Sequence, residues 1–394
     1  MGSASRSDAR DGRSSRDHQG MRSAEAGEAW TDGARVPSRP SIGTTALVFI
    51  GVTAMLGLVG LSMAEGLLAW DVRFAYLPAA EAVLAGENPY PALDDPILDE
   101  QKGYVYPPQL LFALMPLTPL PVPVAAALVA AGMIALLLAT LRVLGIRDIR
   151  CYAAALLWVP AISGVLLSNI SIPLAFALAV LWRYRDAVWP PAIALGLSVS
   201  AKLLLWPMLV WTLATRRVRA TLAAALIGVS VTVAAWAAIG FDGLRTYPDL
   251  LERLSELQSE RSYSFVGMAK TVGLAPSVGS AVSLLVGASL LVLCVAFARR
   301  DDDVRSFTCA VAATLVLSPI VWLHYLVALL VPLAIARPRF SAIWLLPVVL
   351  WVSPKPGYAE GWATFAPGIA AAILLVVLLY PRRRREPEIV EAPA

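Results

Sequence analysis

Asp71 is the residue in this chain whose type and place best suit acid–base chemistry. It directly follows Trp70 at the end of the first long apolar run, and tryptophan is enriched where a membrane helix meets water. The tryptophan would therefore fix the position of the carboxylate relative to the membrane surface. Partial burial of the carboxylate would raise its basicity. We predict that Asp71 acts as a general base. The alternative is a solvated acid at a helix end that pairs with Arg73.

Lys202 and His324 are the polar residues that stand out within the apolar part of the chain. Ionisable groups at membrane depth are costly to bury and are functional candidates by default. We predict that both residues are functional and that Lys202 reaches a lipid phosphate. Two alternatives remain open. Lys202 could extend along its aliphatic stem to the interface, and His324 could be an interfacial histidine bonded to the backbone.

Four tyrosines lie in the polar stretch 70–109, the first long interruption after the first apolar run. An aromatic ring with a hydroxyl suits the face of a sugar, and it equally suits the membrane interface. Proline turns around them would hold the stretch against the membrane. The residues predicted on this basis to bind the sugar or the acceptor are Tyr76, Tyr90, Tyr104 and Tyr106.

The acidic clusters of the chain are weaker candidates. Asp94, Asp95, Asp99 and Glu100 have no spacing that defines a cation site, which favours a solvated acidic loop. Asp301–Asp303 contains the Asp-x-Asp pattern of nucleotide-sugar enzymes, but it occupies a tight charged turn with no fold around it to hold a nucleotide. We expect neither a metal nor another cofactor.

The composition shows what must position these residues. Of 394 residues, 58% are hydrophobic and only 15% are charged, whereas soluble domains have about 25% charged residues. This predicts an all-α polytopic membrane protein surrounded by membrane lipids. The net charge of +4 implies no nucleic-acid partner, because the arginines stand at the ends of apolar runs, where the positive-inside rule places them.

The arginine pattern predicts about twelve transmembrane helices in the plasma membrane, with both termini in the cytoplasm. Several spans are shorter than the roughly 20 residues needed to cross, so they are tilted or stop at an internal cavity. The run 188–215 is predicted to be two short spans that meet near Lys202. The other spans are predicted near 44–69, 122–141, 151–168, 170–182, 220–239, 277–298, 305–321, 324–336, 341–353 and 364–380.

The predicted organisation is a disordered cytoplasmic tail over 1–42, a membrane domain over 43–381 and a cytoplasmic tail over 382–394. Two outer loops project from the membrane domain. The first, 70–109, should carry short juxtamembrane helices. The second, 240–275, contains leucines at helical spacing, which indicates a helix on the membrane surface.

Several motifs together resemble those of family-87 glycosyltransferases. The first outer loop reads D-V-R-F-A-Y-L-P-A-A-E-A-V-L-A-G-E-N-P-Y and then Y-V-Y-P-P. The resemblance extends to Ser168-Asn169, to A-K-L-L-L-W-P around Lys202 and to S-P-I-V-W-L-H-Y around His324. At 168–169 the family tends to have Gly-Gln or Gly-Asn. The family includes polyprenyl-phosphate-mannose-dependent alpha-mannosyltransferases.

The resemblance implies the C-type glycosyltransferase fold, with an aspartate after the first span, here Asp71, as catalytic base. It implies transfer of a hexose, mannose in the best-known members, from a polyprenyl-phosphate donor on the extracytoplasmic face. The acceptor would be a glycolipid or a glycan, and a single displacement would invert the anomeric centre. The phosphate of such a donor needs cations, for which Lys202, His324 and Arg73 are the candidates. Asn169 and Trp322 join the residues expected to bind sugar or acceptor.

A transporter or lipid flippase of cell-envelope precursors is the alternative from another class, because twelve spans with both termini inside suit it as well. Transporters usually show two similar halves and paired charges within the membrane. Here the polar residues concentrate at one face, and the longest loop comes first. An inactive membrane scaffold is a third possibility. The enzyme is the interpretation that the motifs favour.

Overall fold

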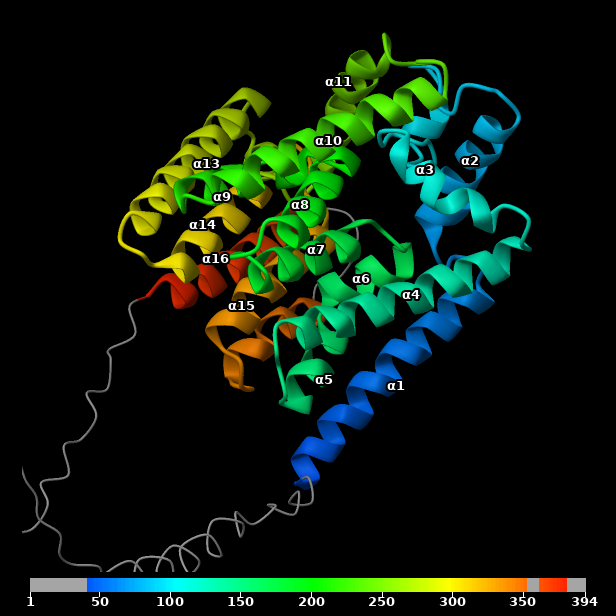
Figure 1. Ribbon diagram of the computed structural model, residues 1–394. Coiled ribbons are helices and arrows are strands. Elements are labelled where there is room, and N and C mark those ends of the chain that lie inside the picture. The colour runs from blue at the N-terminus through cyan, green and yellow to red at the C-terminus, as the bar shows by residue number, and fades with distance from the viewer. Residues whose placement is uncertain (1–40, 353–360, 381–394) are drawn as a thin grey trace, which may run out of the picture. The chain divides into compact units, whose positions relative to one another are not determined.

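The computed structural model describes residues 41–352 and 361–380, and every regular element in these ranges is a helix (Figure 1). Five helices are long and apolar enough to cross a bilayer, and one bent pair brings the number to six. The prediction of an all-α polytopic membrane protein is therefore confirmed. The long helices are α1 (Ile42–Ala64), α4 (Val122–Val143), α10 (Val218–Ala238), α13 (Pro276–Ala298) and the segment Gly361–Leu379, which ends in α16 (Phe365–Leu379).

Shorter helices fill the middle of the molecule (Figure 1). A helix of 13 residues rises about 20 Å, less than the roughly 30 Å of a hydrocarbon core. These helices coincide with predicted spans, but their length alone does not carry them across, so the total of twelve stays a prediction. They are α7 (Ser171–Arg183), α8 (Trp189–Ala201), α9 (Pro207–Ala214), α14 (Asp303–Val316) and α15 (Leu330–Ala336).

Breaks between these helices occur at identifiable residues. α5 (Ile149–Leu157) and α6 (Val159–Leu167) meet at 67° where Trp158 is extended. α8 ends at Ala201, and Lys202 is extended with φ −158° and ψ 117°. The predicted interruption at Lys202 is therefore present. Irregular backbone at membrane depth is tolerated where it lines a cavity, and Lys202 does so, as described below.

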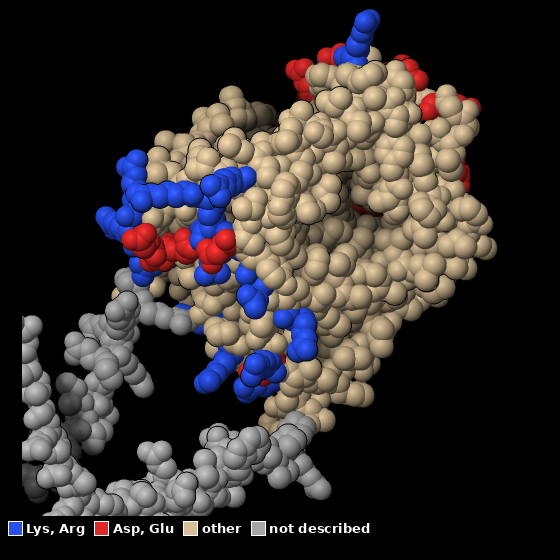
Figure 2. Space-filling model, viewed as in Figure 1, with Lys and Arg blue, Asp and Glu red and all other residues tan. Residues whose placement is uncertain are grey.

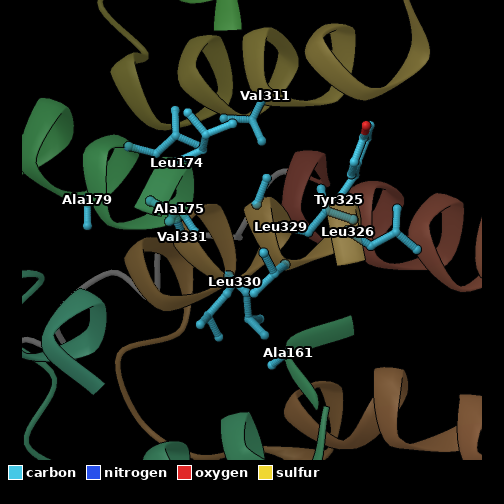
Figure 3. Close-up of a cluster of buried hydrophobic side chains, with 14 of the residues drawn as sticks. Ala161, Leu174, Ala175, Ala179, Val311, Tyr325, Leu326, Leu329, Leu330 and Val331 are labelled. Atoms are coloured by element: carbon cyan, nitrogen blue, oxygen red, sulfur yellow. The ribbon is translucent and has the colours of Figure 1, made fainter. Parts of the chain in front are cut away.

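The main apolar core surrounds η6 (Leu323–Leu329), the 3-10 helix that carries His324. Figure 3 shows Leu329, Leu330 and Val331 among side chains from α6 and α7, while the hydroxyl of Tyr325 extends beyond the cluster. All seven residues of η6 are buried. Close packing restricts side-chain movement, so the core holds the segment around His324 in one position.

A second apolar cluster lies beneath the first loop. The loop contains short helices as predicted, η1 (Val72–Tyr76) and α2 (Leu77–Leu84), and ends where α3 (Gln109–Leu114) begins. Tyr90 stacks on Trp236 of α10 with ring centroids 5.5 Å apart. The predicted surface helix of the second loop is α11 (Tyr247–Gln258), which contributes Leu250 to the same cluster. The two loops thus pack together as one cap. The predicted tails, apart from residues 41 and 42, lie outside the described residues.

Candidate active site

A cavity of about 810 Å³ lies between the first loop, α11 and the breaks in the short helices. Figure 2 shows the surface hollowed below the end that carries α11. The cavity is lined by segments far apart in sequence, which only the fold brings together. Seven of the predicted site residues line it: Asp71, Tyr76, Tyr106, Asn169, Lys202, Trp322 and His324.

Asp71 is held by neutral hydrogen-bond donors. Asn169 Nδ2 donates to Asp71 Oδ2 at 2.5 Å, and the Tyr76 hydroxyl donates to the same oxygen at 3.3 Å. The backbone before it is anchored, because the Ala69 N–H donates to the Leu166 carbonyl at 2.7 Å. No ion pair reaches Asp71 from any residue that the structure describes. The other carboxylate oxygen, Oδ1, is therefore available to a substrate hydroxyl.

Asn169 has a fixed orientation. Its Oδ1 accepts from the Ser171 N–H at 3.0 Å and from the Ser171 hydroxyl at 2.7 Å. The amide nitrogen must then point the other way, toward Asp71 and the Tyr106 hydroxyl, which lies 3.3 Å away. Asn169 lines the cavity, but its polar atoms are occupied in positioning the carboxylate.

The surroundings of Asp71 make it a stronger base than an ordinary aspartate. Burial raises its pKa to about 6, although the hydrogen bonds from Asn169 and Tyr76 and the positive charge of Lys202 act in the opposite direction. At neutral pH the group remains ionised and ready to accept a proton. A pKa close to the working pH is the condition under which general-base catalysis is efficient.

Lys202 presents a positive charge to the cavity. Its ammonium donates to the Tyr325 hydroxyl and lies 3.8 Å from the centroid of the Tyr325 ring and 5.2 Å from that of Tyr106. No carboxylate of the described ranges lies within ion-pair distance of it. A lysine without an acidic partner in a cavity suits an anionic ligand.

His324 adds a second polar group to the same wall. The residue is only 5% exposed, and its Nε2 has no hydrogen-bond partner among the residues described. Buried polar atoms normally have a hydrogen-bond partner, and a buried atom without one requires an explanation. Because His324 lines the cavity, a bound ligand would supply the missing partner.

The cavity wall beside Lys202 is apolar. Leu203 and Trp206 line it, with 68% and 40% of their surfaces exposed. Leu317 and Ile320 line the cavity as well. Apolar side chains this exposed next to a half-buried cation can accommodate a molecule that has both a hydrocarbon chain and an anionic group.

Three predicted site residues do not line the cavity. Arg73 is absent from its wall and forms no ion pair with Asp71. Tyr90 and Tyr104 are buried beneath the first loop. The Tyr90 hydroxyl donates to the Tyr106 carbonyl at 3.1 Å, and the Tyr104 hydroxyl donates to the Pro107 carbonyl at 2.6 Å. The two tyrosines hold the turn that carries Tyr106, so in this structure they support the site from behind.

Sequence reasoning missed several residues that line the cavity or support its wall. Ser171 acts only through Asn169, and Tyr325 could have been suspected because it directly follows His324. Gln101 and Gln258 line the cavity and bond to each other, although 157 positions separate them. A single polar residue in a loop carries no sequence signal that would predict such a contact.

A sequence model of glycosyltransferase family 87 matches residues 104–319, more than half of the chain. The matched segment includes Asn169 and Lys202 and ends five residues before His324, while Asp71 precedes it. Neither the curated proteins nor the solved structures contain a significant match. The resemblance of the motifs is thereby confirmed, and the chain is a membrane protein that belongs to glycosyltransferase family 87.

Proposed function

We propose that this membrane glycosyltransferase transfers a hexose from a polyprenyl-phosphate donor to a hydroxyl of a lipid-linked or polysaccharide acceptor. The observation that carries the proposal is one cavity that contains a carboxylate, Asp71, and a cation, Lys202, with no ion pair between them. The carboxylate suits a base and the cation suits a phosphate. Mannose is the hexose that the family resemblance favours.

The donor would lie against the wall formed by Lys202 and His324. The ammonium would bind the phosphate, and His324 would donate through its unpartnered Nε2. The exposed side chains of Leu203 and Trp206 would contact the polyprenyl chain. A water-soluble nucleotide sugar would leave these apolar side chains without a ligand to contact.

The reaction would be a single displacement. Asp71 Oδ1 would take the proton of the acceptor hydroxyl as its oxygen bonds to the anomeric carbon. The bond from that carbon to the phosphate oxygen would break on the opposite face, and the electron pair would leave with the phosphate. Lys202 would stabilise the growing negative charge. One displacement inverts the anomeric centre, and the step requires no metal.

The charge distribution supports an active site on the extracytoplasmic face of the plasma membrane. Figure 2 shows Lys and Arg gathered around the turn between α13 and α14 and around α5, away from α11. Cytoplasmic ends of membrane proteins carry such an excess. In intact cells, cysteines introduced at the exposed Glu87 and Glu256 should react with an impermeant thiol reagent. Labelling only after lysis would reverse this orientation.

The direct test is a transfer assay with purified protein. Polyprenyl-phosphate mannose is mixed with alkyl glycoside acceptors, and mass spectrometry follows the products. The proposal predicts a mannosylated acceptor of inverted configuration together with free polyprenyl phosphate. If the donor lipid crosses vesicle membranes intact and is never cleaved, the chain is a lipid transporter instead.

A further inference from the structure

A second polar wall of the cavity is formed by the first loop and α11, separately from Lys202 and His324. Gln101 and Gln258 are its central side chains. Gln101 Nε2 donates to Gln258 Oε1 at 3.0 Å, and Gln258 Nε2 donates to the Leu98 carbonyl at 3.2 Å. Gln258 is only 1% exposed. These two hydrogen bonds fix the orientation of the Gln258 amide, and the Gln258 amide in turn orients Gln101.

Gln101 keeps unused hydrogen-bonding capacity at the cavity. Its Nε2 has a second hydrogen, and its Oε1 has no partner among the residues described. A primary amide with one free acceptor and one free donor can bond to a hydroxyl group in either direction. A polyol offers several such hydroxyls at neighbouring carbon atoms.

The backbone at Gln101 has a conformation that favours glycine. Its φ of 58° lies in the left-handed region, which is costly for most residues with a side chain. It ends the turn after the 3-10 helix η2 (Pro96–Leu98), where the Lys102 N–H donates to the Ile97 carbonyl at 3.0 Å. Glycine or asparagine usually occupies such a position. Glycine can therefore replace Gln101 without disturbing this turn.

The charged side chains around this wall already have partners. Glu100 also lines the cavity and pairs with Lys102 at 2.8 Å, and Asp99 pairs with Arg261 at 2.9 Å. Figure 2 shows acidic side chains over this end of the molecule. A phosphate would find the nearby cations Lys102 and Arg261 already paired here, and a cation without an acidic partner at Lys202. A neutral hydroxyl-rich group needs no cation.

We propose that the Gln101–Gln258 pair is the acceptor subsite and binds a neutral polyol or sugar headgroup. The inference rests on the proposed transferase function. Gln101 would bond to a hydroxyl beside the reacting one, while Gln258 acts as a positioning residue that orients Gln101. The cavity would then separate its substrates by charge, with the phosphate at Lys202 and the neutral acceptor beneath α11.

The test replaces Gln101 with glycine, which removes the side chain and favours the same backbone. Octyl mannoside is the acceptor probe and polyprenyl-phosphate mannose is the donor. We expect the KM for octyl mannoside to rise about tenfold, the effect of one lost hydrogen bond. The KM for the donor should stay unchanged, and the melting temperature should not fall. Gln258→Met should raise the acceptor KM in the same direction.

Asp301→Gly is the matched control, because Asp301 has a φ of 55° but lies in the turn before α14, outside the cavity wall. It should leave both KM values unchanged. An acceptor KM within twofold of wild type in Gln101→Gly, or an equal rise of both KM values, would overturn the subsite. If the wild type transfers to no alkyl glycoside, the proposed function itself fails.

Discussion

Two groups of charged residues differ in how their charges are neutralised. At the turn before α14, Asp303 Oδ2 accepts from Arg217 at 2.7 Å and from Arg185 at 3.3 Å. The Arg217 guanidinium also pairs with Asp186 at 3.2 Å. In the cavity, by contrast, Asp71 is bonded only to neutral groups.

The difference separates charges that hold the fold together from charges that remain reactive. The guanidinium carbon of Arg185 lies 4.5 Å from the centroid of Trp182, and that of Arg217 lies 5.0 Å from the centroid of Trp211, so both are packed as well as paired. Lys202 is packed against Tyr325 but has no carboxylate beside it. The paired charges have their partners already, whereas Asp71 and Lys202 have no oppositely charged partner and can bind groups of a substrate.

The largest effect is expected from Asp71→Asn. Asparagine keeps the shape of the side chain but cannot take a proton, and a general base contributes typically 10²–10⁴-fold. We expect transfer to fall by about that factor while the donor still binds. Donor affinity and turnover in purified protein measure the two effects separately. Asp94→Asn, an exposed acid of the same loop, should stay within a few-fold of wild type.

A smaller effect is expected from Lys202→Met, which keeps the stem and removes the charge. Hydrogen bonds to charged groups contribute about 1.5–3 kcal/mol, so the KM for the donor should rise about 10- to 100-fold. Lys270→Met is the control, since Lys270 is exposed and pairs with Glu260. An unchanged donor KM in Lys202→Met would mean that Lys202 merely extends to the interface.

The smallest effect on catalysis is expected from Asp303→Asn. Removing the carboxylate leaves two arginines without their shared partner, and the side chain of Arg217 is only 15% exposed. We expect a loss of about 1–2 kcal/mol in the free energy of unfolding, because the group is partly buried. Thermal unfolding measures this loss, and transfer should stay within a few-fold of wild type. A large loss of transfer at full stability would contradict the division into structural and reactive charges.

Much of the helical pattern follows from the sequence, because charges and prolines interrupt apolar runs where the helices end. The break at Lys202 is an example. Ser168 is another, because its φ of 52° lies in the region where glycine is favoured. This gives a physical reason for the glycine that the family tends to have at this position, directly before its Gln or Asn. Local signals of this kind can be read without a structure.

The arrangement of the site is less predictable. The contact between Gln101 and Gln258 joins two loops that pack together only in the folded protein. The four tyrosines look alike in sequence, yet Tyr76 and Tyr106 line the cavity while Tyr90 and Tyr104 are buried behind it. Their different positions depend on the packing against Trp236 and the prolines, which no local pattern encodes.

The pH dependence of transfer tests most directly whether Asp71 is the base. Because burial raises the pKa of Asp71 to about 6, the ionised, active form is lost as the pH falls through that value. We predict that kcat/KM falls about tenfold per unit as the pH drops below 6. Asn169→Leu removes a donor that lowers this pKa, so it should move the acid limb to higher pH. A wild-type profile that stays flat from pH 8 down to pH 5 would contradict the assignment of Asp71 as the base.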